Sequence, residues 1–172
     1  MLGAIIGDIV GSRFEWENYK RKDFELFAKE CMPTDESIMS LAIGAGLLKS
    51  QPDYENLEKN TIECMQSLGR QYPYCGYGVS FYFWVFGDDP KPYNSYGNGA
   101  AMRVSAAGTV ASSLEEALEL SKRVTVISHN HPEGIKGAQA TAAAIYLAKT
   151  GSTKEEIKDY INRNFYKIDF TL

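Results

Sequence analysis

Apolar residues recur at helical spacing along most of this chain, and this periodicity limits the fold more than any other feature of the sequence. Leu2, Ile5, Ile6 and Ile9 stand at positions i, i+3, i+4 and i+7, and Gly11 then interrupts the pattern. That spacing is typical of one buried helix face. It predicts a short buried helix at the start of the fold.

The same periodicity returns in later segments. Further helices are expected at residues 34–48, 57–68, 114–127, 132–149 and 153–164. Residues 79–86 are apolar on both faces, so periodicity alone does not separate a buried helix from a strand, and we favour a helix because its neighbours are helical. Residues 69–78 and 87–99 are rich in Pro, Gly and Asn and are expected to be loops. The predicted fold class is therefore all-α.

Two capping patterns compete at the start of the last predicted helix. Ser152 with Glu155 and Thr153 with Glu156 both have the spacing of a capping box, in which a hydroxyl and a carboxylate satisfy backbone N–H groups. Gly151 is placed to end the helix before them. The sequence predicts a helix start here and leaves both pairs open.

Composition indicates a single folded domain over residues 1–172. The chain is 44% hydrophobic and 23% charged, which is ordinary for soluble globular proteins. With a net charge of -4 and one short basic run at residues 20–22, no nucleic-acid partner is expected. Three widely spaced cysteines predict neither disulfides nor a zinc site, and no apolar run approaches the roughly 18 residues that span a membrane. A cytoplasmic location is the expectation.

Two segments contain carboxylates that could act in catalysis or bind a metal ion. Gly7 and Gly11 end the first predicted helix and lead to Glu15, which is either a functional carboxylate or a solvated one after a helix end. Thr34, Asp35 and Glu36 precede the second helix. Their oxygens suit Mg²⁺, yet a threonine followed by acids is also ordinary helix capping.

Two further segments combine polar residues with a helix start. Residues 94–103 read Asn-Ser-Tyr-Gly-Asn-Gly-Ala-Ala-Met-Arg, a glycine-rich loop that would point backbone N–H groups at an anion such as a pyrophosphate. Residues 128–134 contain both histidines of the chain, His129 and His131. These histidines could bind a metal, exchange protons or lie beside a ligand, and a structural role is about equally expected.

Taken in this order, the four segments resemble the ADP-ribosylglycohydrolase family, of the dinitrogenase reductase-activating glycohydrolase type. The resemblance implies a compact orthogonal helical bundle that binds ADP-ribose beside Mg²⁺ or Mn²⁺ and hydrolyses its glycosidic bond to an acceptor side chain. It implies a catalytic role for Glu15 and metal ligands at Thr34, Asp35 and Glu36. It also implies ADP-ribose contacts from Ser95, Tyr96, Gly97, Asn98, Gly99, Ala100 and His129.

The chain departs from the family pattern at two points. The usual Thr-Asp-Asp-Thr reads Thr34-Asp35-Glu36-Ser37, and the Gly-Gly-Asp-x-Asp-Thr element that supplies the other metal ligands is absent from the sequence. The resemblance therefore implies the N-terminal part of the fold, without its C-terminal helices. Apolar faces at residues 38–48 or 138–148 are then expected to be uncovered.

Three functions remain open at this level. The chain is an ADP-ribosylglycohydrolase whose metal site is completed by a second polypeptide or a second copy, or a catalytically inactive module that binds ADP-ribose or a related nucleotide. The third alternative is an interaction or inhibitor domain that acts through an exposed helical face. Glu15 and the Gly97 to Gly99 loop favour the first, whereas Glu36 and the absent element favour the second.

Overall fold

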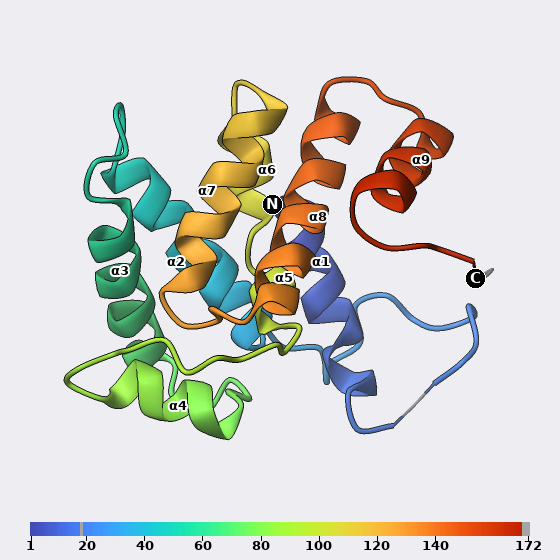
Figure 1. Cartoon of the computed structure of the whole chain (residues 1–172). Coiled ribbons are helices and arrows are strands. Elements are labelled where there is room, and N and C mark those ends of the chain that lie inside the picture. The colour runs from blue at the N-terminus through green and yellow to red at the C-terminus, as the bar shows by residue number, and fades with distance from the viewer. Residues whose placement is uncertain (18, 170–172) are drawn as a thin grey trace.

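The computed structural model describes residues 1–17 and 19–169, so residue 18 and residues 170–172 of the predicted 1–172 domain lie outside the described part. Within it the chain forms nine α-helices, one 3-10 helix and no strand, which confirms the all-α prediction (Figure 1). The elements are α1 (Leu2–Gly11), η1 (Ser12–Phe14), α2 (Asp35–Lys49), α3 (Leu57–Gln71), α4 (Val79–Phe86), α5 (Gly99–Met102), α6 (Ser105–Val110), α7 (Leu114–Val126), α8 (Pro132–Lys149) and α9 (Lys154–Asn164).

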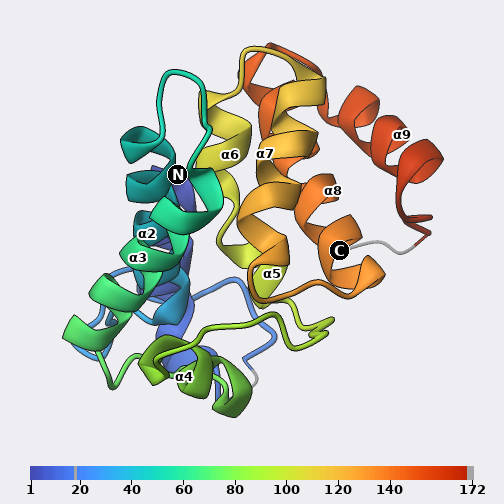
Figure 2. The ribbon, with the colours of Figure 1, turned by 60° about the vertical axis from the view of Figure 1, so that its left-hand side comes forward.

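The helices form a bundle around a core of aliphatic and aromatic side chains. Figures 1 and 2 both place α4 at one end of this bundle, with the segment that joins α4 to α5 passing beside it, while α9 lies at the outer edge next to α8. The core takes its largest buried side chains from α2, α3, α4 and α7, among them Met39, Ile43, Leu47, Met65, Trp84, Val85 and Val124.

Two glycines allow neighbouring helices to approach closely. A Cβ atom on Gly46 of α2 would lie 2.8 Å from Cα of Thr61 in α3, and one on Gly108 of α6 would lie 2.5 Å from the carbonyl oxygen of Ala142 in α8. Both distances are shorter than a carbon or oxygen contact allows. The α2–α3 and α6–α8 pairs therefore pack backbone against backbone at these points.

The first helix forms where the periodicity predicts it, but the expectation that it is buried is wrong. Only Asp8 and Val10 are buried in α1, whereas Leu2 is 71% and Ile6 is 41% exposed. The reason is tertiary, because α2 is the main helix that packs against α1 and it covers one side alone. An apolar face of α1 is left in contact with solvent.

The expectation of an uncovered face on the longer helices holds for part of α2. Leu41 and Leu48 of α2 are exposed, while Ala138 and Ala142 of α8 are buried. A Cβ atom on Gly44, which lies on the same side of α2 as Leu41 and Leu48, would meet the Met1 sulfur at 3.2 Å. The exposed leucines therefore border the start of α1. We call Met1, Leu2, Ile6, Leu41 and Leu48 the α1–α2 apolar surface.

Helix bounds differ from the predicted ones in two places. Helix α3 continues to Gln71, into the segment predicted as a loop, and residues 99–110 form α5 and α6, which periodicity does not separate. The ambiguous segment Val79–Phe86 is helical, as we favoured. Its Trp84 donates an indole hydrogen bond to the Ile127 carbonyl at 3.0 Å, which ties α4 to the end of α7.

The structure decides between the two capping patterns of α9. The Thr153 side chain accepts from the Glu156 backbone N–H at 3.2 Å, and the Glu156 carboxylate accepts from the Thr153 N–H at 2.7 Å. We expect Thr153→Ala to lower the free energy of unfolding by about 1 kcal/mol, the usual value of such a cap. Urea unfolding measures it, with Ser152→Ala as the matched control that changes stability by less than about 0.5 kcal/mol. Equal losses in the two variants would contradict the assignment.

No helix within residues 1–17 and 19–169 combines the length and the apolar character needed to cross a membrane.

Candidate functional site

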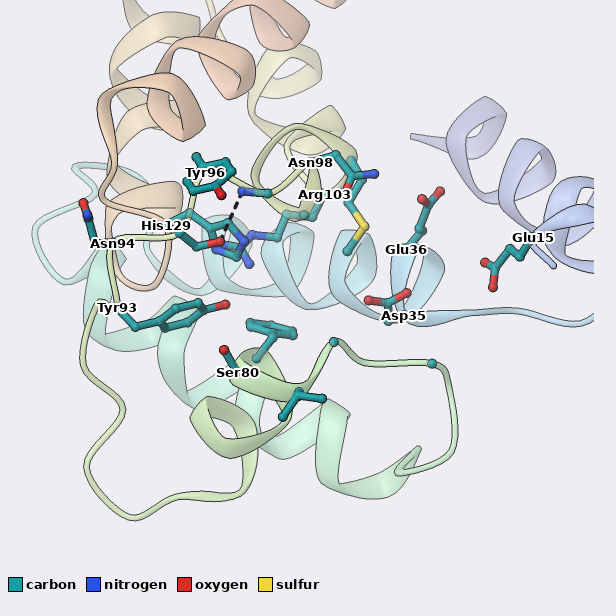
Figure 3. Close-up of a pocket in the computed structure, with 18 of the residues that line it drawn as sticks. Glu15, Asp35, Glu36, Ser80, Tyr93, Asn94, Tyr96, Asn98, Arg103 and His129 are labelled. Atoms are coloured by element: carbon teal, nitrogen blue, oxygen red, sulfur yellow. Dashed lines mark hydrogen bonds between the residues drawn. The ribbon is translucent and has the colours of Figure 1, made fainter. Parts of the chain in front are cut away.

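A large cleft in the described part of the chain brings residues from all four sequence segments together. It has a volume of about 740 Å³, within the range of small-molecule sites. Figure 3 shows Tyr93, Tyr96 and His129 at one end and Glu15, Asp35 and Glu36 at the other. The walls include residues from all these elements, namely Glu15, Trp16, Asp35, Glu36, Gly76, Gly78, Val79, Ser80, Phe81, Tyr93, Asn94, Ser95, Tyr96, Gly97, Asn98, Gly99, Met102, Arg103 and His129.

At the acidic end, the buried carboxylate of Asp8 fixes the start of α2. It accepts from the backbone N–H groups of Thr34 at 2.9 Å and Ser37 at 3.1 Å. It also accepts from both hydroxyl groups, from Thr34 at 2.5 Å and from Ser37 at close range. An anion at a helix N-terminus is favoured by the unpaired N–H groups there. Asp8 therefore joins α1 to α2 and sets the position of the residues that follow Thr34.

The structure places Thr34 as the N-cap of α2. Its Oγ1 accepts from the Glu36 N–H at 3.3 Å while donating to Asp8, and its side chain is buried. The capping alternative for this segment is thus confirmed. Thr34 is absent from the walls of the large cleft, whereas Asp35 and Glu36 line it.

The carboxylates of Asp35 and Glu36 lie in an environment that favours their protonated forms. The pKa of Asp35 is raised to about 7, mainly by burial and then by the charges of Glu36, Glu15 and Asp8, in that order. Burial, followed by Asp8 and Glu15, also raises the pKa of Glu36. A site that concentrates negative charge in this way gains from a bound cation, because the cation would offset the mutual repulsion.

The donor set at this end fits a divalent cation in kind but not in number. Mg²⁺ prefers oxygen ligands and takes six of them in near-octahedral geometry, so two carboxylates leave several positions for other oxygens. Residues 1–17 and 19–169 hold no group of three or more His, Cys, Asp or Glu side chains that would enclose an ion. Asp35 and Glu36 thus form at most one side of a metal site.

Glu15 follows the 3-10 helix η1 and lies at the rim of the cleft. Its side chain is exposed, and together with Trp16 it also lines a second cavity of about 690 Å³. The two cavities therefore meet at Glu15. A carboxylate in this position is accessible from both sides.

The glycine-rich segment lies along the wall opposite α4. Ser95 Oγ accepts from the Gly97 N–H at 3.2 Å, and the Asn98 carbonyl accepts from the Ala101 N–H at 2.9 Å, which starts α5. Tyr96 is 75% exposed and packs edge-on against His131. Ala100 packs into the hydrophobic core instead of lining the cleft.

His129 lies deep in the cleft, beside a buried cation. Arg103 is fully buried, and its Nη2 donates to Ser128 Oγ at 2.7 Å. Burial lowers the pKa of Arg103 to about 10, so its guanidinium stays charged at neutral pH. Burial, and then the Arg103 charge, lower the pKa of His129 to about 3. The histidine is therefore neutral over the physiological range.

Several wall residues were not among the sequence-predicted site residues. Trp16, Ser80, Phe81, Tyr93 and Arg103 line the cleft, and Phe81 lies 5.5 Å from the Arg103 guanidinium carbon. Arg103 is the last residue of the glycine-rich segment 94–103, so the sequence motif could have indicated it as a site residue. The other four belong to segments read as loop or core helix, where the sequence gives no indication of a cleft.

Comparison with known proteins agrees with this architecture. Two curated relatives are both described as "ADP-ribosylhydrolase ARH3", one from Xenopus tropicalis at 26% identity and one from Gallus gallus at 24% identity. Each match covers 91% of this chain and 51% of the relative, so the chain spans about half the length of the curated relatives it matches. The family model described as ADP-ribosylglycohydrolase matches residues 1–168. The chain belongs to the ADP-ribosylglycohydrolase family.

Proposed function

We propose that this chain binds ADP-ribose in the 740 Å³ cleft and takes part in hydrolysis of the bond between ADP-ribose and an acceptor side chain. The observation that carries the proposal is the cleft itself, which joins a carboxylate end to a glycine-rich wall backed by a buried arginine. A ligand with a diphosphate and a reactive ribose needs both kinds of surface. Family membership supports the same assignment, as does the likeness to relatives described as ADP-ribosylhydrolases.

The proposed orientation follows from the charges along the cleft. We place the diphosphate at residues 97–99, on the side of Arg103, and the ribose that carries the scissile bond near Asp35 and Glu15. The carboxylates would repel the diphosphate, whereas the Arg103 cation attracts it through a low-dielectric wall. Asn94, Ser95 and Tyr96 would line the remaining length of the ligand.

Glu15 is the proposed acid–base residue. In the hydrolysis, the bond between the ribose C1 and the acceptor breaks, a water oxygen bonds to C1, and the proton that this water loses passes by way of Glu15 to the leaving acceptor. Glu15 is accessible from both cavities, so its carboxylate can accept the proton from the attacking water. The second cavity, on the other side of Glu15, would admit the acceptor side chain.

The remaining metal ligands are proposed to come from a further polypeptide segment, in the same or another chain. Asp35 and Glu36 give only part of a ligand shell, and the α1–α2 apolar surface offers exposed area for contact. Exposed apolar patches of this kind mark interaction sites. A cation bound at Asp35 and Glu36 would stabilise charge that develops on the substrate.

Calorimetry with ADP-ribose tests the binding step. We expect binding in chelator, because residues 94–103 and His129 need no metal, and tighter binding with Mg²⁺ or Mn²⁺ present. Gly99→Ala should weaken binding by about tenfold, since its Cβ would lie 3.1 Å from His129 Nε2 and fill the space over the loop. Gly3→Ala is the matched control, because nothing lies within 4 Å of its Cβ. Absence of binding to ADP-ribose in all conditions would overturn the proposal.

Turnover of an ADP-ribosylated peptide separates the enzyme from a binding module. Release of ADP-ribose that requires a divalent cation and is lost in Glu15→Gln supports hydrolysis. Binding without release under any of these conditions favours the second candidate, a module that recognises ADP-ribose. The observation that favours this second candidate is the incomplete set of metal ligands at Asp35 and Glu36.

A further inference from the structure

Arg103, Ser128 and His129 form a buried chain of polar groups behind the glycine-rich loop. Arg103 Nη2 lies 2.7 Å from Ser128 Oγ, and Ser128 Oγ lies 2.9 Å from His129 Nδ1. All three side chains are buried, with His129 at 4% exposure. The direction of each hydrogen bond in this chain follows from the chemistry of the groups.

The first bond has only one allowed direction. A guanidinium carries donors and no acceptor, so Arg103 donates and Ser128 Oγ accepts. The Ser128 hydroxyl then has one hydrogen of its own to place. Among the described residues, His129 Nδ1 is the acceptor that lies within hydrogen-bond distance of this hydroxyl.

The opposite direction for the second bond leaves a buried donor unpaired. If His129 Nδ1 carried the proton, Ser128 Oγ would accept from both neighbours and its own hydrogen would have no acceptor. A buried donor without a partner costs about 1 to 3 kcal/mol. The favourable arrangement therefore has Ser128 donating to an unprotonated Nδ1.

A neutral imidazole with an unprotonated Nδ1 carries its hydrogen on Nε2. In this structure Nε2 points at the glycine-rich loop, because a Cβ on Gly99 would lie 3.1 Å and one on Gly97 would lie 3.9 Å from it. The described hydrogen bonds give Nε2 no protein acceptor, and His129 lines the cleft (Figure 3). This N–H group is available to a ligand.

We infer that Arg103 and Ser128 are positioning residues that fix His129 as a neutral Nε2–H donor, aimed at an acceptor oxygen of the ligand over Gly97 and Gly99. The inference rests on the proposed function for the identity of that ligand, ADP-ribose. Such a nitrogen has no lone pair for a metal ion, so His129 serves recognition of the nucleotide and takes no part in the metal site.

The charged and titratable neighbours of His129 support a fixed neutral state. Arg103 lies behind its partner Ser128, the Tyr93 ring packs against its edge at 5.5 Å, and no carboxylate bonds to the ring among the described residues. A cation nearby opposes protonation of the imidazole. The low pKa of His129 described above agrees with this arrangement. The contribution of His129 to ADP-ribose affinity in chelator should therefore not change between pH 5 and pH 8.

Nitrogen NMR of the whole chain tests the tautomer without any ligand. The sequence contains two histidines, so ¹⁵N-labelled protein gives two imidazole spin systems, and His131→Asn assigns them while keeping an N-cap side chain for α8. We expect His129 to show a protonated Nε2 and an unprotonated Nδ1 from pH 5 to pH 8. A protonated Nδ1, or a ring that titrates within this range, overturns the inference.

Variants of Ser128 link the tautomer to binding. Ser128→Ala should give a mixture of His129 tautomers and weaken ADP-ribose binding by about fivefold, the value of one hydrogen bond. Ser128→Thr keeps the hydroxyl and should retain the single His129 tautomer and the wild-type affinity for ADP-ribose. If His129 keeps the same tautomer in Ser128→Ala, the positioning role of Ser128 is wrong. If that variant does not fold, the wild-type spectrum alone tests the tautomer. An Nε2–H tautomer without ADP-ribose binding would instead refute the proposed function, while the roles of Arg103 and Ser128 in fixing the tautomer would still hold.

Discussion

Replacing Asp8 with alanine is expected to lower the free energy of unfolding by about 3 to 5 kcal/mol, the range for removing one partner from a buried charged contact. The variant would leave two backbone N–H groups and two hydroxyl groups of Thr34 and Ser37 without their shared acceptor. For a domain of this size, each kcal/mol corresponds to roughly 2 to 4 °C in Tm. Thermal and urea unfolding should therefore show a fall in Tm of about 10 °C.

Two controls separate the lost acceptor from other effects on α1. Gly7→Ala changes the neighbouring residue, where nothing lies within 4 Å of the new Cβ, and should leave stability unchanged or slightly raised. Asp8→Asn keeps one acceptor oxygen and should fall between wild type and Asp8→Ala. If Asp8→Ala and Gly7→Ala had the same stability, the role of Asp8 in holding the start of α2 would be wrong.

Replacing Asp35 with asparagine is expected to stabilise the protein at pH 8 and to have little effect near pH 4. The pKa of Asp35 is raised from 3.8 to about 7, so the folded state binds the proton more tightly than the unfolded state. Stability from this group is complete below pH 3.8 and is lost as the pH rises towards 7. A shift of this size corresponds to about 4 kcal/mol, and partial exposure of the side chain reduces the expected gain to about 2 kcal/mol.

Urea unfolding of wild type and Asp35→Asn at pH 4, 6 and 8 measures this effect. Asp88→Asn is the matched control, since it makes the same substitution at an exposed position outside the walls of the cleft. The same experiment with Mg²⁺ adds a second expectation, because a cation at Asp35 should stabilise wild type at pH 8 and not the variant. A loss of stability in Asp35→Asn at pH 8 without metal would contradict the assigned environment.

The fold was largely predictable, because helices of 10 or more residues carry a clear periodicity. α2, α3, α7, α8 and α9 begin within a few residues of their predicted positions. Short helices carry too few turns for that signal, so α5 and α6 were not separated. The burial of α1 was mispredicted because an apolar stripe does not say whether another element covers it.

Some residues of the candidate site could be predicted from the sequence, and others could not. The resemblance to the ADP-ribosylglycohydrolase family could be found from four short motifs, and Glu15, Asp35, Glu36, Gly97 and His129 do line one cleft. Ser80 and Tyr93 could not be found, because neither belongs to a motif and their position depends on how α4 and the following segment pack.

The sequence by itself determined the helical class, the helix start at Thr34 and the family, since each depends on patterns among residues that are near one another in the chain. Only the tertiary structure decided which polar groups meet. Asp8 contacts Thr34 across 26 residues, and Arg103 contacts Ser128 across 25. Periodicity and capping act within a few residues, whereas contacts of this kind depend on how the helices pack, and packing sets the charge of Asp35 and the tautomer of His129.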